Sequence, residues 1–143
     1  NLPVVDRTTH GSADLVDKGA YILKEADGLA DVILIATGSE VCIALSVQEA
    51  LAAKSIRARV VSAPCLEWFA EQSPAYRESV LPKDARLKVS IEAGISMGWA
   101  EFTGSSGRSI SLEHFGASAS AKELFAAFGF TTERVVALVE DVL

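Results

Sequence analysis

The feature that most constrains the fold is a short apolar run that ends in a glycine turn. Residues 32–36 read Val-Ile-Leu-Ile-Ala, followed by Thr37-Gly38-Ser39. A run without polar alternation is typical of a strand that is buried on both faces. After the turn, apolar residues recur at helical spacing, which predicts a helix. We expect Ser39 to cap its first turn. Strand, turn and helix together form half of a parallel α/β unit.

The helix predicted over residues 40–52 has one apolar stripe. We expect the stripe to face the core and the polar residues Glu40, Gln48 and Glu49 to lie mostly outside it. The stripe consists of Val41, Ala44, Leu45, Leu51 and Ala52.

Further segments complete an alternating pattern of strands and helices. Strands are expected at residues 18–25, 57–62, 87–92 and 108–112, and helices at 66–71, 73–81, 120–129 and 131–143. Ser73-Pro74 is a helix start, and Ser120 with Glu123 forms a capping box. Residues 95–103 fit either a strand or an irregular loop, and their glycines favour the loop.

The connection between the first two strands is too short for a crossover helix, since only a turn at Asp27-Gly28 separates them. We therefore expect the first strand to run antiparallel to the second. The fold class predicted is α/β, a three-layer α/β/α sandwich with a five-stranded mixed sheet. Residues 1–12 are expected to be an extended lead-in from a preceding domain, and 13–143 to form one domain.

Composition excludes several classes of protein. The net charge is −6 with no basic run, which argues against nucleic-acid binding. No stretch approaches the roughly 18 apolar residues of a membrane span, and the start of the chain lacks a signal pattern, so we expect a cytoplasmic protein. Cys42 and Cys65 suit neither a disulfide framework nor a metal site. The chain begins at Asn1 and has Met97 as its one methionine, as expected of a piece of a longer polypeptide.

Candidate chemistry is sparse. Gly38-Ser39 at a helix start could hold an anion, but tight turn geometry is the favoured interpretation, since Glu40 would repel the anion and no phosphate-binding motif is present. Glu92 ends a buried strand at the edge where α/β sheets place ligands. The favoured alternative is a surface or interface salt bridge with Arg77, Arg86 or Arg108. His114 could be oriented by Glu92 as a base, although no nucleophile motif accompanies it. His10 is expected to be solvated.

Aromatic residues are expected to pack in the core rather than to stack on ligands. The expected packing residues are Trp68, Trp99, Phe102, Phe128 and Phe130. The glycine-rich segment 94–107, which contains Trp99 and Phe102, would also suit a contact with another subunit or domain.

Several motifs occur in an order that resembles one known family. The chain resembles the C-terminal domain of bacterial transketolases over nearly its whole length. The motifs are Ala-Thr-Gly-Ser-Glu-Val at 36–41, Arg-Val-Val-Ser-Ala-Pro at 59–64, Ala-Tyr-Arg-Glu-Ser-Val-Leu-Pro at 75–82, Ile-Glu-Ala-Gly-Ile at 91–95, Phe-Gly-Ala-Ser-Ala at 115–119, Leu-Phe at 124–125 and Phe-Gly-Phe-Thr at 128–131. Ser120 and the run 96–99 depart from the usual family pattern.

The resemblance implies a parent enzyme that transfers a two-carbon ketol unit between sugar phosphates of the pentose phosphate pathway. Such enzymes are homodimers that use thiamine diphosphate and a divalent metal, magnesium or calcium, held by their first two domains. The family's Gly-Asp-Gly signature is missing here, since Ala26-Asp27-Gly28 lacks the first glycine. We therefore expect no catalytic, cofactor-binding or metal-binding residue in this chain, and no activity of the chain alone.

Two other hypotheses remain open from the sequence. The chain could be an anion- or nucleotide-binding regulatory module that uses Gly38-Ser39 and the strand-end carboxylates, with Glu92 and His114 as site residues. It could also be purely an assembly domain. Saturable binding of phosphate or nucleotides would indicate the former, and self-association the latter.

Overall fold

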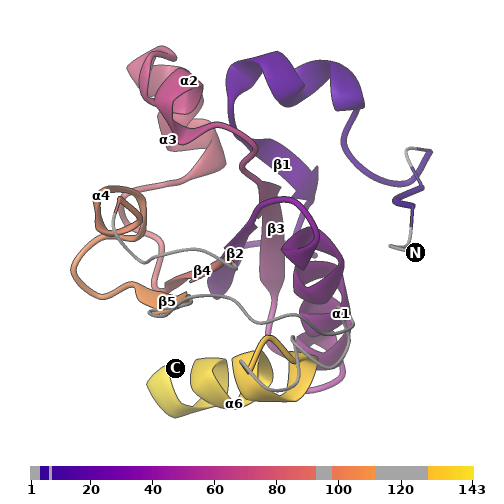
Figure 1. Cartoon of the computed structure of the whole chain (residues 1–143). Coiled ribbons are helices and arrows are strands. Elements are labelled where there is room, and N and C mark those ends of the chain that lie inside the picture. The colour runs from indigo at the N-terminus through magenta and orange to yellow at the C-terminus, as the bar shows by residue number, and fades with distance from the viewer. Residues whose placement is uncertain (1–3, 7, 93–97, 112–128) are drawn as a thin grey trace, which may run out of the picture.

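The computed structural model describes residues 4–6, 8–92, 98–111 and 129–143 (Figure 1). The strands are β1 (Tyr21–Lys24), β2 (Val32–Ala36), β3 (Ala58–Ser62), β4 (Lys88–Ile91) and β5 (Arg108–Ile110). The helices are the 3₁₀ helix η1 (Ala13–Lys18) and the α-helices α1 (Glu40–Ala52), α2 (Leu66–Ala70), α3 (Pro74–Val80), α4 (Ala100–Thr103) and α6 (Thr132–Val142).

The described strands form one five-stranded sheet in the order β1-β3-β2-β4-β5. β2, β3, β4 and β5 run parallel to one another, and β1 is antiparallel to its neighbour β3. The mixed sheet and the reversed direction of the first strand are thus confirmed. The strand to which β1 is hydrogen-bonded is β3, however, because the connection over residues 25–31 carries the chain past β3 to the centre of the sheet.

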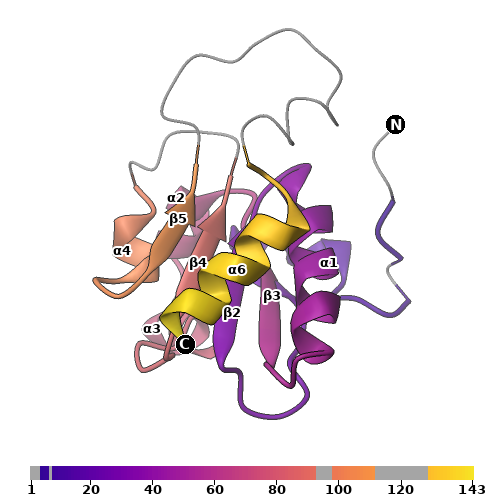
Figure 2. The same cartoon turned by 90° about the horizontal axis from the view of Figure 1, so that it is seen from below.

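Helices cover both faces of the sheet, which gives the predicted three layers. Figures 1 and 2 show α1 and α6 on one face and α2, α3 and α4 on the other. The side chains of β2 alternate between the two faces: Val32 and Leu34 belong to the cluster beneath α1 and α6, whereas Ile33 and Ile35 belong to the opposite cluster. All of β2 is buried, as the continuous apolar run predicts.

The start of α1 differs from the expectation. Ser39 already has helical backbone angles, and its hydroxyl caps no backbone N–H. Instead, Ser39 Oγ donates a hydrogen bond of 2.7 Å to Glu40 Oε1. The predicted cap at Ser73 is confirmed, since its side chain accepts a hydrogen bond from the Tyr76 backbone N–H and Pro74 occupies the first turn.

The buried face of α1 also departs from the predicted stripe. Glu40 and Gln48 are buried, 4% and 7% exposed, whereas Leu45 is half-buried and Ala52 is exposed. Gln48 is buried because its amide nitrogen donates to the backbone carbonyls of Glu25 and Ala58 at 3.1 and 2.8 Å. These hydrogen bonds compensate for the lost hydration of the amide nitrogen, whereas Gln48 Oε1 is buried without a partner among the described residues.

Two other predicted segments, residues 95–103 and 120–129, are described only in part. Residues 100–103 form the short helix α4, rather than the strand or loop expected there. The capping box at Ser120 and Glu123 lies outside the described residues. At the end of that predicted helix, Gly129 has a φ of 79°, the left-handed conformation expected of a helix-terminating glycine.

Candidate functional site

The candidate residues lie at the carboxyl ends of β2 and β4, the edge of the sheet where α/β proteins commonly bind ligands. β2 and β4 are parallel neighbours, and Ala36 pairs with Ile91 at their last residues. The Gly38-Ser39 turn and Glu92 therefore leave the sheet at the same edge. His114 lies outside the described residues, so its approach to Glu92 stays a prediction.

The Gly38-Ser39 turn offers little room for an anion. The carboxylate of Glu40 lies at the first turn of α1. It accepts a hydrogen bond from the Ser39 hydroxyl. Its Oε2 atom is also close to Gly38, 3.8 Å from the position that a Cβ would take there. The side chain is also buried, so its charge is poorly screened. A second anion at this helix start would be repelled by the carboxylate already there.

Within the described residues, the contacts of Glu92 differ from the salt bridge favoured as its alternative role. Its carboxylate accepts a hydrogen bond from the indole N–H of Trp99, and its backbone N–H donates to the Ile110 carbonyl at 3.1 Å. Among the described residues, Glu92 has no ion pair with an arginine. Arg86 and Arg108, two of the partners considered, instead donate to backbone carbonyls.

The aromatic residues divide into buried and exposed ones. Trp99 is 3% exposed within the cluster on the α2–α4 face, and the ring of the half-buried Phe102 lies 6.0 Å from that of Phe69. Phe130 is buried as well. Trp68 is 52% exposed, so the expectation that it packs in the core is wrong. The interface role suggested for Trp99 and Phe102 stays a prediction.

His10, the other histidine, lies in the lead-in. Its Nδ1 is 2.7 Å from the Asp6 carbonyl oxygen and 2.9 Å from Thr9 Oγ1, so the ring is held within its own loop.

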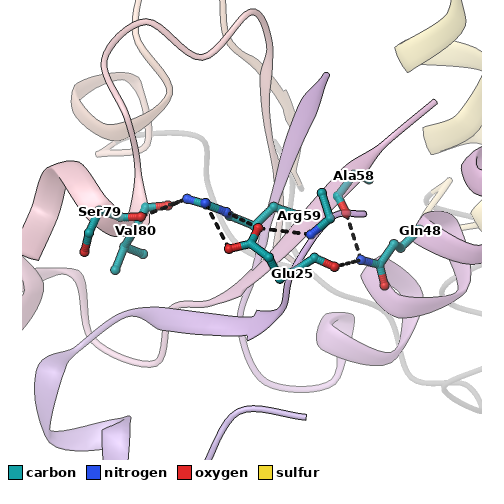
Figure 3. A network of polar contacts seen from close by, with 7 residues as sticks. Glu25, Gln48, Ala58, Arg59, Ser79 and Val80 are labelled. Atoms are coloured by element: carbon teal, nitrogen blue, oxygen red, sulfur yellow. Dashed lines mark hydrogen bonds and ion pairs between the residues drawn. The ribbon is translucent and has the colours of Figure 1, made fainter. Parts of the chain in front are cut away.

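Sequence analysis missed a charged network that joins β3 to two other parts of the chain (Figure 3). Arg59 donates two hydrogen bonds to the Glu25 carboxylate, at 2.7 and 3.0 Å, and two to the carbonyls of Ser79 and Val80, at 2.9 and 3.0 Å. Burial alone would raise the pKa of Glu25, but hydrogen bonds from Arg59 and from a backbone N–H lower it overall. A lone arginine between apolar strand residues is the signal that could have pointed to this network.

The described residues contain neither a metal-binding cluster nor a disulfide. No group of three or more His, Cys, Asp or Glu side chains within these ranges could hold a metal ion. Cys42 and Cys65 are not joined by a disulfide. In the described part of the chain, no helix combines the length and apolar character needed to cross a membrane.

Comparison with known proteins identifies the family. The profile described as "Transketolase-like TK C-terminal domain" matches residues 19–131. A transketolase of Mycobacterium tuberculosis is 47% identical over 147 aligned residues, which cover 99% of this chain and 21% of the relative. The chain therefore spans about a fifth of that relative's length.

Solved structures agree with the sequence comparison. The transketolase of Pichia stipitis in complex with sedoheptulose-7-phosphate matches with a TM-score of 0.87 and 35% identity, over 99% of this chain and 20% of that one. A protein described as "Split gene transketolase, inactive beta4 tetramer" matches with a TM-score of 0.74 and 25% identity, over 100% of this chain and 47% of that one. The described fold, the motifs and these relatives show that the chain belongs to the transketolase family and corresponds to its C-terminal domain.

Proposed function

We propose that this chain is the C-terminal structural and assembly domain of a thiamine diphosphate-dependent transketolase. The parent enzyme would transfer a two-carbon ketol unit from a ketose phosphate to an aldose phosphate in the pentose phosphate pathway. The chain would stabilise and position the domains that carry the active centre, and would not itself be catalytic.

The observation that carries this proposal is the extent of the match. The alignment covers nearly the whole chain but about a fifth of the M. tuberculosis relative, and the Pichia stipitis structure is matched over a similar share. Most of such an enzyme is therefore contributed by sequence that this chain does not contain. The regulatory module built on Gly38-Ser39 is not supported, since the comparisons point to transketolases and Glu40 occupies the helix start.

The residues present do not fit the cofactor of the family. A divalent metal that holds a diphosphate needs several oxygen ligands, and the described residues offer no cluster of suitable side chains. We infer that thiamine diphosphate and its metal, magnesium or calcium, are held by other domains of the parent, and we assign no step of the reaction to this chain.

The partners follow from the same proposal. They are the preceding domains of the parent chain, a second subunit in a homodimer, and sugar phosphates as substrates of the parent, in the cytoplasm. Residues 1–12 would lead in from the preceding domain and 13–143 would form this one. One relative is by its title an inactive tetramer, which supports the idea that a polypeptide carrying such a domain can assemble without activity.

Two measurements test the proposal. The chain alone should give no turnover of xylulose 5-phosphate plus ribose 5-phosphate with thiamine diphosphate and Mg²⁺ present. A variant of the parent enzyme that ends just before residue 1, and so lacks this domain, should be less stable or should fail to form the dimer in sedimentation, relative to the full-length enzyme. Turnover by the chain alone would refute the structural role, and an unaltered truncated dimer would refute the assembly role.

A further inference from the structure

A pocket of about 550 Å³ lies on the opposite face of the sheet from α1 and α6. It is bounded by α3 and the residues after it, by α4, and by Lys88 at the start of β4. β4 runs parallel to β2, so Lys88 lies at the opposite end of the strands from Gly38 and Glu92. The pocket is therefore distinct from the candidate residues at the carboxyl edge.

The most informative residue of this pocket is Lys88. It is 7% exposed, yet its side chain makes no hydrogen bond or ion pair within the part of the chain that the structure describes. Burial lowers the pKa of Lys88, while the charges of Glu78 and Asp84 partly oppose that shift. A lysine side chain with little access to solvent and no close partner loses part of its hydration, which an anion bound beside it would replace.

A second cation faces the same pocket. Arg77 also lines it, and the Nε atom of Arg77 is buried without a hydrogen-bond partner. Lys83 adds a third positive charge. The acidic lining residues are Glu78, whose Oε1 accepts the Lys83 backbone N–H at 3.0 Å, and Glu101. The lining thus has three positive groups and two carboxylates, and Asp84 acts on Lys88 as a further negative charge. Arg77 and Lys88 have unused donors among the described residues.

The remaining wall is apolar. Phe69, Leu81 and Phe102 contribute to it, so a ligand could place an apolar body against the wall and an anionic group against the two cations. We propose that this pocket binds a carboxylate or phosphate group attached to an apolar or aromatic body, with Lys88 and Arg77 holding the anion. The anion could come from a free small molecule or from an acidic side chain elsewhere in the parent enzyme.

The test uses the chain itself, with phenyl phosphate and benzoate as probes in calorimetry and in ¹H–¹⁵N NMR titrations. We expect saturable binding of at least one probe, and none of benzylamine, which has a similar ring and the opposite charge. Lys88→Met should weaken binding about tenfold or more, the usual effect of losing a charged hydrogen bond. Lys54→Met, a control on an exposed lysine that pairs with Glu140, should bind like the unmodified chain.

Folding is monitored alongside binding. Methionine in place of a mostly buried lysine without a side-chain partner should leave the thermal midpoint unchanged or raise it, whereas loss of a structural ion pair would lower it. Arg77→Gln provides a second variant that should also weaken binding. No saturable binding of either probe, or equal binding by both variants and the unmodified chain, would overturn the proposal.

A final arm distinguishes the two sources of the anion. If the full-length parent binds the probe as the chain does, the pocket serves a free small molecule. If only the chain binds it, an acidic group of the parent already fills the pocket. Both results support the anion site, and binding to the chain does not depend on the proposed transketolase function.

Discussion

Replacing Arg59 with methionine tests how much the network of Figure 3 stabilises the domain. The Arg59 side chain is 16% exposed, and its guanidinium links the Glu25 carboxylate to the carbonyls of Ser79 and Val80 at the end of α3. Methionine preserves much of the aliphatic stem and removes every donor. The loss therefore reports on the hydrogen bonds rather than on packing.

The ion pair with Glu25 and the hydrogen bonds to the two carbonyls should contribute unequally to the free energy of unfolding. The Glu25 side chain is 52% exposed, so its pair with Arg59 should contribute about 0.5–1 kcal/mol, as surface ion pairs do. The two carbonyls accept hydrogen bonds from a charged donor, and together these should contribute about 1.5 kcal/mol, since water replaces part of them. Arg59→Met should lower the free energy of unfolding by about 2–2.5 kcal/mol.

Urea unfolding followed by circular dichroism at neutral pH measures this loss. Glu25→Gln is the matched variant, because it removes the ion pair and leaves the donors to the carbonyls, and it should cost about 0.5–1 kcal/mol. A double-mutant cycle should return a coupling of the same size. Equal losses in the two single variants would show that the carbonyl half contributes nothing, and would refute the reasoning.

Two further predictions concern acid stability and backbone geometry. Hydrogen bonds from Arg57 lower the pKa of Asp31 from 3.8 to about 2, so its stabilising effect is present above pH 3.8 and is lost as the pH falls toward 2. Asp31→Asn should therefore flatten the fall of the thermal midpoint over this interval, and equal slopes would contradict the assignment. Gly19→Ala should cost at least about 2 kcal/mol, because φ is 79° and a Cβ would stand 2.3 Å from the Cys65 carbonyl oxygen. Gly129→Ala, where the clash is with the movable Arg134 side chain, should cost less by the same denaturation assay.

Much of the fold could be predicted because local patterns determine it. The run at residues 32–36 has no polar position, which suits only a strand covered on both faces, and this is what β2 is. Ser73-Pro74 combines a capping hydroxyl with a fixed φ, and α3 begins there. The reversed direction of β1 follows from the shortness of the connection to β2.

Features that depend on distant residues could not be predicted. η1 has no apolar period, and no residue of it is buried. Gln48 is buried because its amide nitrogen donates hydrogen bonds to two backbone carbonyls from separate parts of the chain. The Glu92 carboxylate accepts a hydrogen bond from the indole N–H of Trp99, seven residues away, and pairs with no arginine among the described residues. The pocket beside Lys88 is a further example, since α3, the residues after it and α4 form its walls.

The outermost strands of the sheet bear on how copies of this domain can associate. β5 has three residues, and Arg108 and Ser109 are exposed, while β1 has four residues with a register shift between Ile22 and Lys24. Short, charged and irregular border strands are poor templates for an added strand. Subunits would therefore not join by extending one continuous sheet across a two-fold axis through these described borders. Their contacts would instead be made by side chains on helices and loops, which also guards the chain against strand-driven aggregation during synthesis.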